Sequence, residues 1–291
     1  MPSSKTKIAI VGGGVAGLVT ARHMVAKLDI YSITLFEQTD QIGGTWIYTD
    51  KTDFDKHGLL IHSSMYKNLR TNIPKEIMAL PDFPFQNVDG PSFTHHSMIR
   101  EYLMAYAKHF NLHPYIKLNT LVKRVEPETT RNGRTLWTVT YKSLETKEEI
   151  TKTFDAVVLC NGHYSVGRVP HIPGIESFHG RRIHSHQYRM PEIYAGKRVC
   201  ILGASWSGID IALEVSQYAN KLRHINKLKE RQWGYYDELA AAANVPSVAP
   251  VNRKIMEHVF HMRDVDFTTY KNYQYRIIDS ENFSMSYCKP C

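Results

Sequence analysis

The chain has 291 residues, of which 43% are apolar and 22% are charged, so it is long enough to build a packed core for one large domain or two ordinary ones. Its first apolar run, residues 8–11, stops at three glycines, and no stretch reaches the ~18 uninterrupted apolar residues of a membrane helix. The sequence predicts neither a secretory leader nor a membrane span. We therefore expect a soluble cytoplasmic protein.

The formal net charge of +8 favours an anionic partner, and both nucleic acid and phosphorylated cofactors meet that description. The basic residues form no single stripe. Their densest group, residues 221–231, has apolar residues at a spacing that permits an amphipathic helix with a solvated basic face. We therefore expect phosphorylated cofactors and no nucleic acid.

The four cysteines are too few and too scattered for a disulfide scaffold. Cys160 and Cys200 fall at the ends of apolar strand-like runs and are expected to be reduced thiols in the core. Cys288 and Cys291 form a C-x-x-C pair, but it has no second pair and no helical context, so we assign it no function. None of the fifteen histidines has a ligand set that would complete a metal site, and no metal is predicted.

A glycine-rich fingerprint follows the first predicted strand, residues 7–11, and opens a predicted helix that runs to residue 25. In this context the first glycine permits a tight turn, the second lets the backbone approach a pyrophosphate, and the third lets helix and strand pack closely. The helix N-terminus presents free N–H groups to the phosphates. The alternative is a glycine turn unrelated to nucleotides. The residues of this G-x-G-x-x-G motif are Gly12, Gly13, Gly14, Val15, Ala16 and Gly17.

A second strand, residues 33–36, ends in Glu37, about 20 residues after the fingerprint. A carboxylate at this position accepts hydrogen bonds from an unmodified ribose and repels a 2′-phosphate. The first site is therefore predicted to prefer FAD or NAD over NADP.

The middle of the chain predicts a core-facing helix over residues 97–110, because apolar residues recur there at helical spacing. Strands are expected at residues 118–125, 136–141 and 154–159, followed by an extended linker that begins at residue 169. No cofactor role is assigned to the helix.

A second fingerprint follows the predicted strand 197–202 and opens a helix that reaches about residue 218. Its central glycine is replaced by Ser205, whose hydroxyl can donate to a phosphate. We interpret it as an NADPH site, and the alternative is a degenerate nucleotide fold kept for packing. The residues assigned to this site are Gly203, Ser205, Ser207, Gly208 and Asp210.

Residues 178–188, between the two fingerprints, read F-x-G-x-x-x-H-x-x-x-Y. This motif, placed between two nucleotide fingerprints, is similar to a motif of the flavin-containing monooxygenases. The chain as a whole resembles that family from residue 5 to about 221 and again from about 232 to 275. The absence of a C-terminal membrane anchor suits an insect-type member. The resemblance implies an α/β, Rossmann-like flavoprotein with two dinucleotide-binding domains. We interpret the motif as a structural hinge, in which Phe178 and Ile183 pack a domain junction and His184 and Tyr188 bond across the linker or reach NADP⁺.

The resemblance also implies the chemistry. NADPH reduces FAD, oxygen adds at flavin C4a, and the hydroperoxide oxygenates a small soft nitrogen or sulfur nucleophile. It adds to the FAD contacts a G-G-x-W loop and a backbone contact near the adenine. These residues are Gly44, Thr45, Trp46 and Val125.

A T-N-x-x-K-E pattern is matched at Thr71, Asn72, Lys75 and Glu76, and the resemblance makes Asn72 the catalytic residue, with Thr71 beside the cofactor. A neutral carboxamide donates and accepts hydrogen bonds without titrating, so it suits a site that must hold flavin and nicotinamide together. Without the resemblance, Asn72 before Ile73 and a proline is equally well interpreted as a turn residue.

The chain departs from the family after the second fingerprint, where it lacks a piece on the order of a hundred residues. We expect an FAD-binding domain at 1–168, a truncated NADPH-binding domain at 169–226, and a C-terminal helical tail at 227–291 that packs on the FAD domain. Residues 222–226 could add one short strand, with Arg223 or His224 near a 2′-phosphate. Two functions stay open: a monooxygenase, or an impaired variant that acts as a nucleotide-binding or interaction protein and could form a homo-oligomer.

Overall fold

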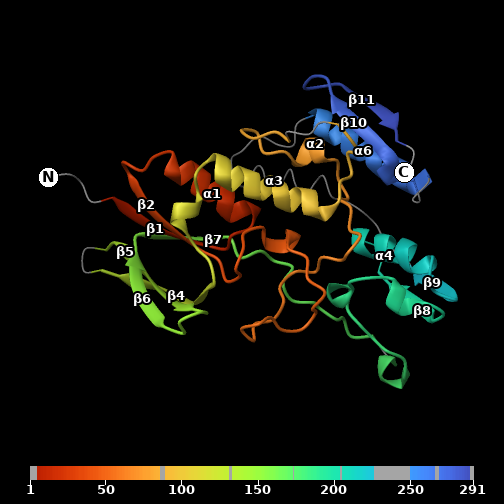
Figure 1. Cartoon of the computed structure of the whole chain (residues 1–291), viewed down its shortest axis with the longest axis horizontal. Helices are drawn as coiled ribbons and strands as arrows, with labels where there is room; N and C mark the ends of the chain where they lie inside the picture. The colour runs from red at the N-terminus through yellow and green to blue at the C-terminus, as the bar shows by residue number, and fades with distance from the viewer. Residues whose placement is uncertain are drawn as a thin grey trace. The chain divides into compact units, whose positions relative to one another are not determined.

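The protein is described by a computed structural model that covers residues 5–85, 89–130, 133–172, 174–203, 205–225, 250–265 and 269–288. It divides into two compact units (Figure 1). Unit 1 consists of Met1–Tyr66 and Ser97–Tyr188, and unit 2 of Lys67–His96 and Arg189–Cys291. The expected functional domains 1–168, 169–226 and 227–291 stay a prediction.

Unit 1 is built on a parallel sheet in the order β3-β2-β1-β7. Ile8, Ala9 and Ile10 of the central strand are buried, as expected for a parallel strand that is covered on both faces. Because all four strands run in the same direction, the end of β1 at Val11 lies beside the end of β2 at Phe36, which is where a nucleotide binds in such sheets. The strands are β1 (Thr6–Val11), β2 (Tyr31–Phe36), β3 (Ile116–Lys117) and β7 (Ala156–Leu159).

Two helices and an antiparallel meander cover this sheet (Figure 1). The helices are α1 (Val15–Val25) and α3 (His96–His109), close to the predicted ranges. Phe36 of β2 packs on Tyr141 of the meander, with ring centroids 4.7 Å apart, within a core cluster that also includes Ala9 and Phe154. The meander strands are β4 (Thr120–Thr129), β5 (Thr135–Ser143) and β6 (Glu149–Phe154). Short 3-10 helices are η1 (Gly44–Trp46), η2 (His113–Tyr115), η3 (Ile175–Ser177) and η4 (Ser185–Gln187).

The single strand predicted over residues 154–159 is wrong, because the chain changes sheets there. Phe154 ends β6 in the meander, and Ala156 begins β7 beside β1. Asp155 marks the change: its carboxylate accepts a hydrogen bond from the Lys7 N–H at 2.7 Å and pairs with Arg134.

Unit 2 contains the segment that carries the second fingerprint, which in the described residues is a βαβ unit of β8 (Arg198–Leu202), α4 (Trp206–Ser216) and β9 (Lys221–Ile225). The two strands pair in parallel, so the short strand expected after residue 221 is observed. The amphipathic helix considered for residues 221–231 is therefore wrong up to residue 225, because β8 takes up the backbone hydrogen bonds of that segment. Residues 226–231 lie outside the described part.

The expectation that Cys160 and Cys200 are core thiols is wrong for Cys200, which is exposed, whereas Cys160 is half-buried. On β8 the alternate residues Val199 and Ile201 are half-buried, and Cys200 faces away from them. Arg198 and Leu202 lie on the same exposed face of β8 as Cys200. Cys288 is half-buried, and Cys291 lies outside the described residues.

The rest of unit 2 packs around a cluster formed by the segment 67–96 and the C-terminal part of the chain. Phe93 lies against Tyr270 and Tyr275, with ring centroids 5.8 and 6.1 Å apart. The expected helical tail thus contains a β-hairpin as well as a helix. The elements are α2 (Lys75–Met78), η5 (Glu192–Tyr194), α6 (Pro250–Val265), η6 (Tyr270–Asn272), β10 (Tyr273–Ile277) and β11 (Phe283–Tyr287).

None of the helices in the described residues has the length and apolar character needed to cross a membrane. The same residues contain no group of three histidine, cysteine, aspartate or glutamate side chains that could hold a metal ion.

Candidate dinucleotide-binding sites

The first and last glycines of the Gly12–Gly17 turn are required by the packing of the protein itself. Gly12 has a φ of +110°, and a Cβ at this residue would lie 2.3 Å from the carbonyl oxygen of Cys160. A Cβ at Gly17 would lie 1.9 Å from the carbonyl oxygen of Gly12. These contacts hold the turn tightly between β1, β7 and α1, as the fingerprint predicted.

Gly14 differs from these two glycines because the protein leaves room at its Cα. Its φ is −79°, which any residue adopts, and an added Cβ would meet only the Cα of Gly44, at an ordinary 3.5 Å. Gly14 is also the N-cap of α1 and makes no side-chain cap, so the first N–H groups of the helix are available to a ligand. The turn therefore fits a pyrophosphate at the point where a Cβ would otherwise stand.

The G-G-x-W loop packs directly against this turn. The Gly43 N–H donates to the Gly13 carbonyl at 3.0 Å, and a Cβ at Gly44 would lie 2.9 Å from the Cα of Gly14. From the other side, the Ser63 hydroxyl donates to the Thr45 carbonyl at 2.8 Å. Sequence reasoning missed Ser63, because no motif connects it to the loop.

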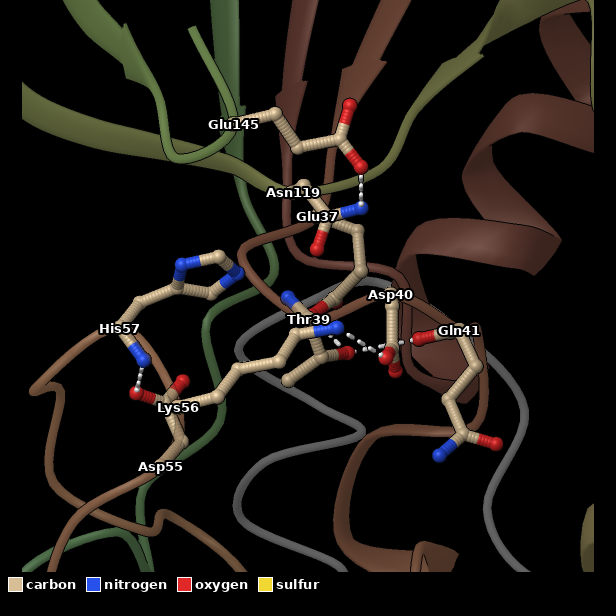
Figure 2. A network of polar contacts seen from close by, with 9 residues as sticks. All are labelled: Glu37, Thr39, Asp40, Gln41, Asp55, Lys56, His57, Asn119 and Glu145. Atoms are coloured by element: carbon tan, nitrogen blue, oxygen red, sulfur yellow. Dashed lines mark hydrogen bonds and ion pairs between the residues drawn. The ribbon is translucent and has the colours of Figure 1, made fainter. Parts of the chain in front are cut away.

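Glu37 is buried, and its carboxylate joins the fingerprint to the end of β2. Figure 2 shows Glu37 beside Thr39. One oxygen accepts the Gly13 N–H at 2.7 Å, and the other accepts the N–H and the hydroxyl of Thr39, both at 2.8 Å. A carboxylate has about four lone-pair positions, so Glu37 retains the capacity to accept from a ribose hydroxyl. Its predicted role with ribose stays a prediction, and its role in holding the turn is new.

The loop that follows Glu37 is held by two basic side chains. Lys56 donates to Asp40 at 2.8 Å, and this hydrogen bond lowers the pKa of the Asp40 carboxyl (Figure 2). Arg100 of α3 donates through Nη2 to the Gln41 side chain at 2.6 Å. The prediction gave α3 a core-facing role only, and so it missed Arg100. Val125 lies on β4 beside the meander core, and its contact with adenine stays a prediction.

The second fingerprint has the same local design as the first. Gly203 has a φ of +112°, and Ser205 is the N-cap of α4 with an extended backbone and no side-chain cap. Ser207 is exposed and Gly208 is half-buried in the first turn of α4. The helix N-terminus thus suits a phosphate. Asp210, also predicted to contact the cofactor, forms an ion pair with Lys271 at 2.5 Å.

The segment that carries Asn72 pairs with residues 92–96 of unit 2. The Thr71 N–H donates to the Thr94 carbonyl at 2.8 Å, and the Thr94 N–H donates to the Thr71 hydroxyl at 3.1 Å. The chain then bends at Asn72 and Ile73, and Asn72 is half-buried. The bend agrees with the interpretation of Asn72 as a turn residue and leaves its catalytic role a prediction.

Two residues of the same motif are anchored beside Asn72. Lys75 is 2% exposed and donates to the Asp89 carbonyl at 3.3 Å. Glu76 accepts from the Ser92 hydroxyl at 2.9 Å, and burial raises the pKa of its carboxyl. The T-N-x-x-K-E motif is therefore held at both ends.

The linker motif makes local contacts. Phe178 is 53% exposed and its ring folds over Gly180, where a Cβ would lie 2.4 Å from the ring, and the packing of Phe178 and Ile183 at a domain junction stays a prediction. His184 accepts the His186 N–H at 3.1 Å as the N-cap of η4. Tyr188 is buried against Tyr66 with ring centroids 5.5 Å apart.

The predicted site residues thus fall into two groups. Unit 1 carries the Gly12–Gly17 turn, Glu37, the loop at Gly44–Trp46, and Val125. Unit 2 carries Thr71 and Asn72 together with the second fingerprint.

Known proteins resemble this chain over most of its length. The family described as flavin-binding monooxygenase-like matches residues 5–231. Flavin-containing monooxygenase FMO GS-OX-like 1 of Arabidopsis thaliana is 38% identical over 80% of this chain and 51% of its own length. Senecionine N-oxygenase of Tyria jacobaeae is 34% identical over 81% of this chain and 50% of its own length. The structure of S-allyl-L-cysteine S-oxygenase from Allium sativum matches with a TM-score of 0.70 and 36% identity, over 80% of this chain and 54% of that one. The chain spans about half the length of these relatives.

Proposed function

The chain belongs to the flavin-binding monooxygenase-like family, whose cofactors are FAD and NADPH, and from this premise we propose that it oxygenates soft nitrogen or sulfur nucleophiles. The family predicted from the sequence and its α/β Rossmann-like fold, with a second domain reduced to one βαβ unit in the described residues, are confirmed. The observation that carries the proposal is that the fold itself does not require a glycine at Gly14, beside the uncapped N-terminus of α1.

In the proposed site, the N–H groups at the start of α1 bind the pyrophosphate of FAD, and Glu37 binds its ribose. Bound FAD supplies the activation of oxygen after reduction by NADPH. The loop at Gly44–Trp46 holds the flavin side of the cofactor. Asn72 offers a carboxamide that keeps its hydrogen-bonding pattern across physiological pH.

The second fingerprint is the proposed NADPH site. The uncapped N-terminus of α4 binds the pyrophosphate, and the Ser205 hydroxyl donates to it. Arg223, exposed in the middle of β9, is the described basic side chain proposed for the 2′-phosphate. If Arg223 does not recognise this phosphate, the purified protein will oxidise NADH as readily as NADPH.

The substrate class rests on the relatives. One is named for S-oxygenation of S-allyl-L-cysteine and another for N-oxygenation of senecionine. Because both kinds match this chain at similar identity, we propose a small soft nucleophile and molecular oxygen as co-substrates.

The deciding experiment is the visible absorbance spectrum of the purified protein, before and after anaerobic addition of NADPH. Bound flavin that bleaches with NADPH supports both nucleotide sites. Protein that stays colourless after incubation with FAD contradicts the oxygenase and favours the second candidate, a nucleotide-binding or interaction protein. The observation behind that candidate is that the described residues of the second nucleotide fold comprise only β8, α4 and β9.

A further inference from the structure

Lys271 lies where three separate segments of unit 2 meet. Its ammonium donates to the carboxylate of Asp210 on α4 at 2.5 Å and to the backbone carbonyl of Arg70 at 3.2 Å. In the opposite direction, Nη2 of Arg70 donates to the Lys271 carbonyl at 2.5 Å. One side chain thus links the second fingerprint helix, the tail and the residue that precedes Thr71.

Additional contacts join the same segments. Arg70 also donates through Nε to the Phe93 carbonyl at 3.0 Å and through Nη1 to the Asn272 side chain at 3.3 Å. Trp206, in the first turn of α4, lies against Tyr270 with ring centroids 6.2 Å apart. Polar and aromatic contacts therefore join the same three segments.

The ion pair is largely withdrawn from water, since the side chains of Lys271 and Asp210 are each 12% exposed. Burial lowers the pKa of Lys271, and the attraction of Asp210 opposes that shift. A pair of this kind contributes little net stability, but the loss of one partner leaves a buried charge without compensation. The best-attested role of a buried ion pair is to select one packing arrangement of the segments that it joins.

We propose that Lys271 is a positioning residue that holds the Thr71–Asn72 segment in register with helix α4, so that nucleotide bound at α4 orders the segment that presents Asn72. This inference rests on the proposed function, because it takes α4 as the NADPH site and Asn72 as the residue that acts beside the cofactors. It assigns Asp210 to the coupling of the two segments and leaves the cofactor contacts to Ser205 and the helix N-terminus.

The test is amide hydrogen exchange of the full chain with and without NADP⁺. In the wild type, NADP⁺ should slow exchange in residues 206–216 and, by at least ~5-fold, in residues 69–78. In Lys271→Met the slowing should persist in 206–216 and be lost in 69–78. Lys271→Arg keeps the cation and should restore part of the effect.

Two variants separate coupling from folding. Lys254→Met removes an ion pair with Glu281 whose side chains are about half exposed, and it should leave both responses unchanged. The double variant Asp210→Asn with Lys271→Met removes both charges of the pair together, so neither is left buried without its partner and the protein should fold, yet it should also lack the response in 69–78. In the loaded enzyme, both Lys271→Met variants should release more hydrogen peroxide per NADPH than the wild type.

The outcomes distinguish the two proposals. If NADP⁺ does not slow exchange in 206–216 of the wild type, the proposed NADPH site is wrong, and the inference is overturned with it. If that region responds but 69–78 does not, or if the double variant keeps the full response in 69–78, only the positioning role of Lys271 is overturned.

Discussion

The carboxylate of Glu37 accepts the backbone N–H of Gly13 at 2.7 Å, so the acidic residue expected to bind ribose also closes the glycine turn from within. Every hydrogen-bond partner found for this carboxylate is a donor: the N–H of Gly13 and the N–H and hydroxyl of Thr39. The protein therefore requires an acceptor at both oxygens before any cofactor binds.

Replacement of Glu37 by glutamine should destabilise the apoprotein, because the new NH₂ group faces one of these donors. A hydrogen bond to a buried charged group contributes about 1.5–3 kcal/mol, so we expect the free energy of unfolding to fall by about 2 kcal/mol. Urea unfolding without FAD measures this. Glu128→Gln, at an exposed position of β4 in the same unit, is the control and should leave the free energy within ~0.5 kcal/mol of the wild type. Equal stability of Glu37→Gln and the wild type would contradict the structural role of Glu37.

The glycines of the first fingerprint should separate folding from cofactor binding. Gly14→Ala adds a methyl group that meets no close protein atom, so the free energy of unfolding should stay the same or rise by up to ~1 kcal/mol. The same methyl group occupies the space proposed for the pyrophosphate, and FAD affinity should fall at least ~10-fold, about 1.4 kcal/mol. Absorbance at 450 nm after desalting and titration with FAD measure the loss.

Gly12→Ala is expected to behave in the opposite way. Its methyl group would lie 2.3 Å from a carbonyl oxygen at a φ of +110°, so the apoprotein should lose at least about 3 kcal/mol of stability. Gly58→Ala isolates the strain of positive φ, because Gly58 has a φ of +78° and an added Cβ there has no neighbour within 4 Å. We expect this variant to lose about 1 kcal/mol of stability.

A stable Gly14→Ala protein with unchanged FAD affinity would contradict the proposed FAD site at the glycine turn.

These local rules explain why the geometry of the first glycine turn was predictable from the sequence. The turn, its helix and the acidic residue at the end of β2 fall within one short stretch of the chain, and each follows from backbone geometry. The contacts that cross the fold were not predictable. Arg100 reaches Gln41 from a helix whose spacing indicated only a core face, and Lys271 is 61 residues away from Asp210.

The C-terminal tail was predicted to be helical, and its β-hairpin was missed although the sequence pattern indicated one. Residues 273–277 and 283–287 each contain two aromatic residues and flank a mostly polar turn, which is typical of a hairpin. The resemblance to a helical tail took precedence over that pattern. At residue 155 the signal was a single charged residue, Asp155, which separates the mostly polar strand β6 from the apolar strand β7, and the prediction joined Phe154 to the apolar run instead.

Asn72→Asp tests the proposed use of a neutral amide. The substitution changes one atom and adds a negative charge where the chain would meet the reduced flavin and nicotinamide, so NADPH-dependent oxygenation should fall ~100-fold or more, a loss of about 2.7 kcal/mol. FAD content should stay equal to the wild type, because the backbone N–H groups proposed to bind the FAD pyrophosphate belong to the glycine turn and the start of α1, which this substitution does not change.

Asn68→Asp makes the same change four residues earlier at an exposed position, and it should keep wild-type activity. Product formation and peroxide release are measured together for both variants. Unchanged oxygenation in Asn72→Asp would return Asn72 to the role of a turn residue.

His96 should make the stability of unit 2 depend on pH. It is 5% exposed, its Nε2 lies 3.2 Å from the Lys67 carbonyl, and its ring lies 4.1 Å from that of His95. Burial, with a smaller contribution from His95, lowers the pKa of His96 from 6.5 to about 4. Between these values the unfolded chain binds a proton that the folded chain does not. The contribution of neutral His96 to the free energy of unfolding is therefore fully present above pH 6.5 and is lost as the pH decreases towards 4.

Between pH 7.5 and pH 5, the titration of His96 should lower the free energy of unfolding by on the order of 2 kcal/mol. This value follows from about 1.4 kcal/mol for each pH unit below the pKa of the unfolded state. Urea unfolding of the wild type and of His96→Gln at both pH values measures it, since glutamine can still donate to the Lys67 carbonyl and does not titrate. The variant should lose less stability than the wild type between the two pH values. His95→Gln, at the exposed neighbour, should retain most of the wild-type dependence, because burial is the larger cause of the shift. Identical pH dependence in the wild type and His96→Gln would show that His96 titrates normally in the folded protein.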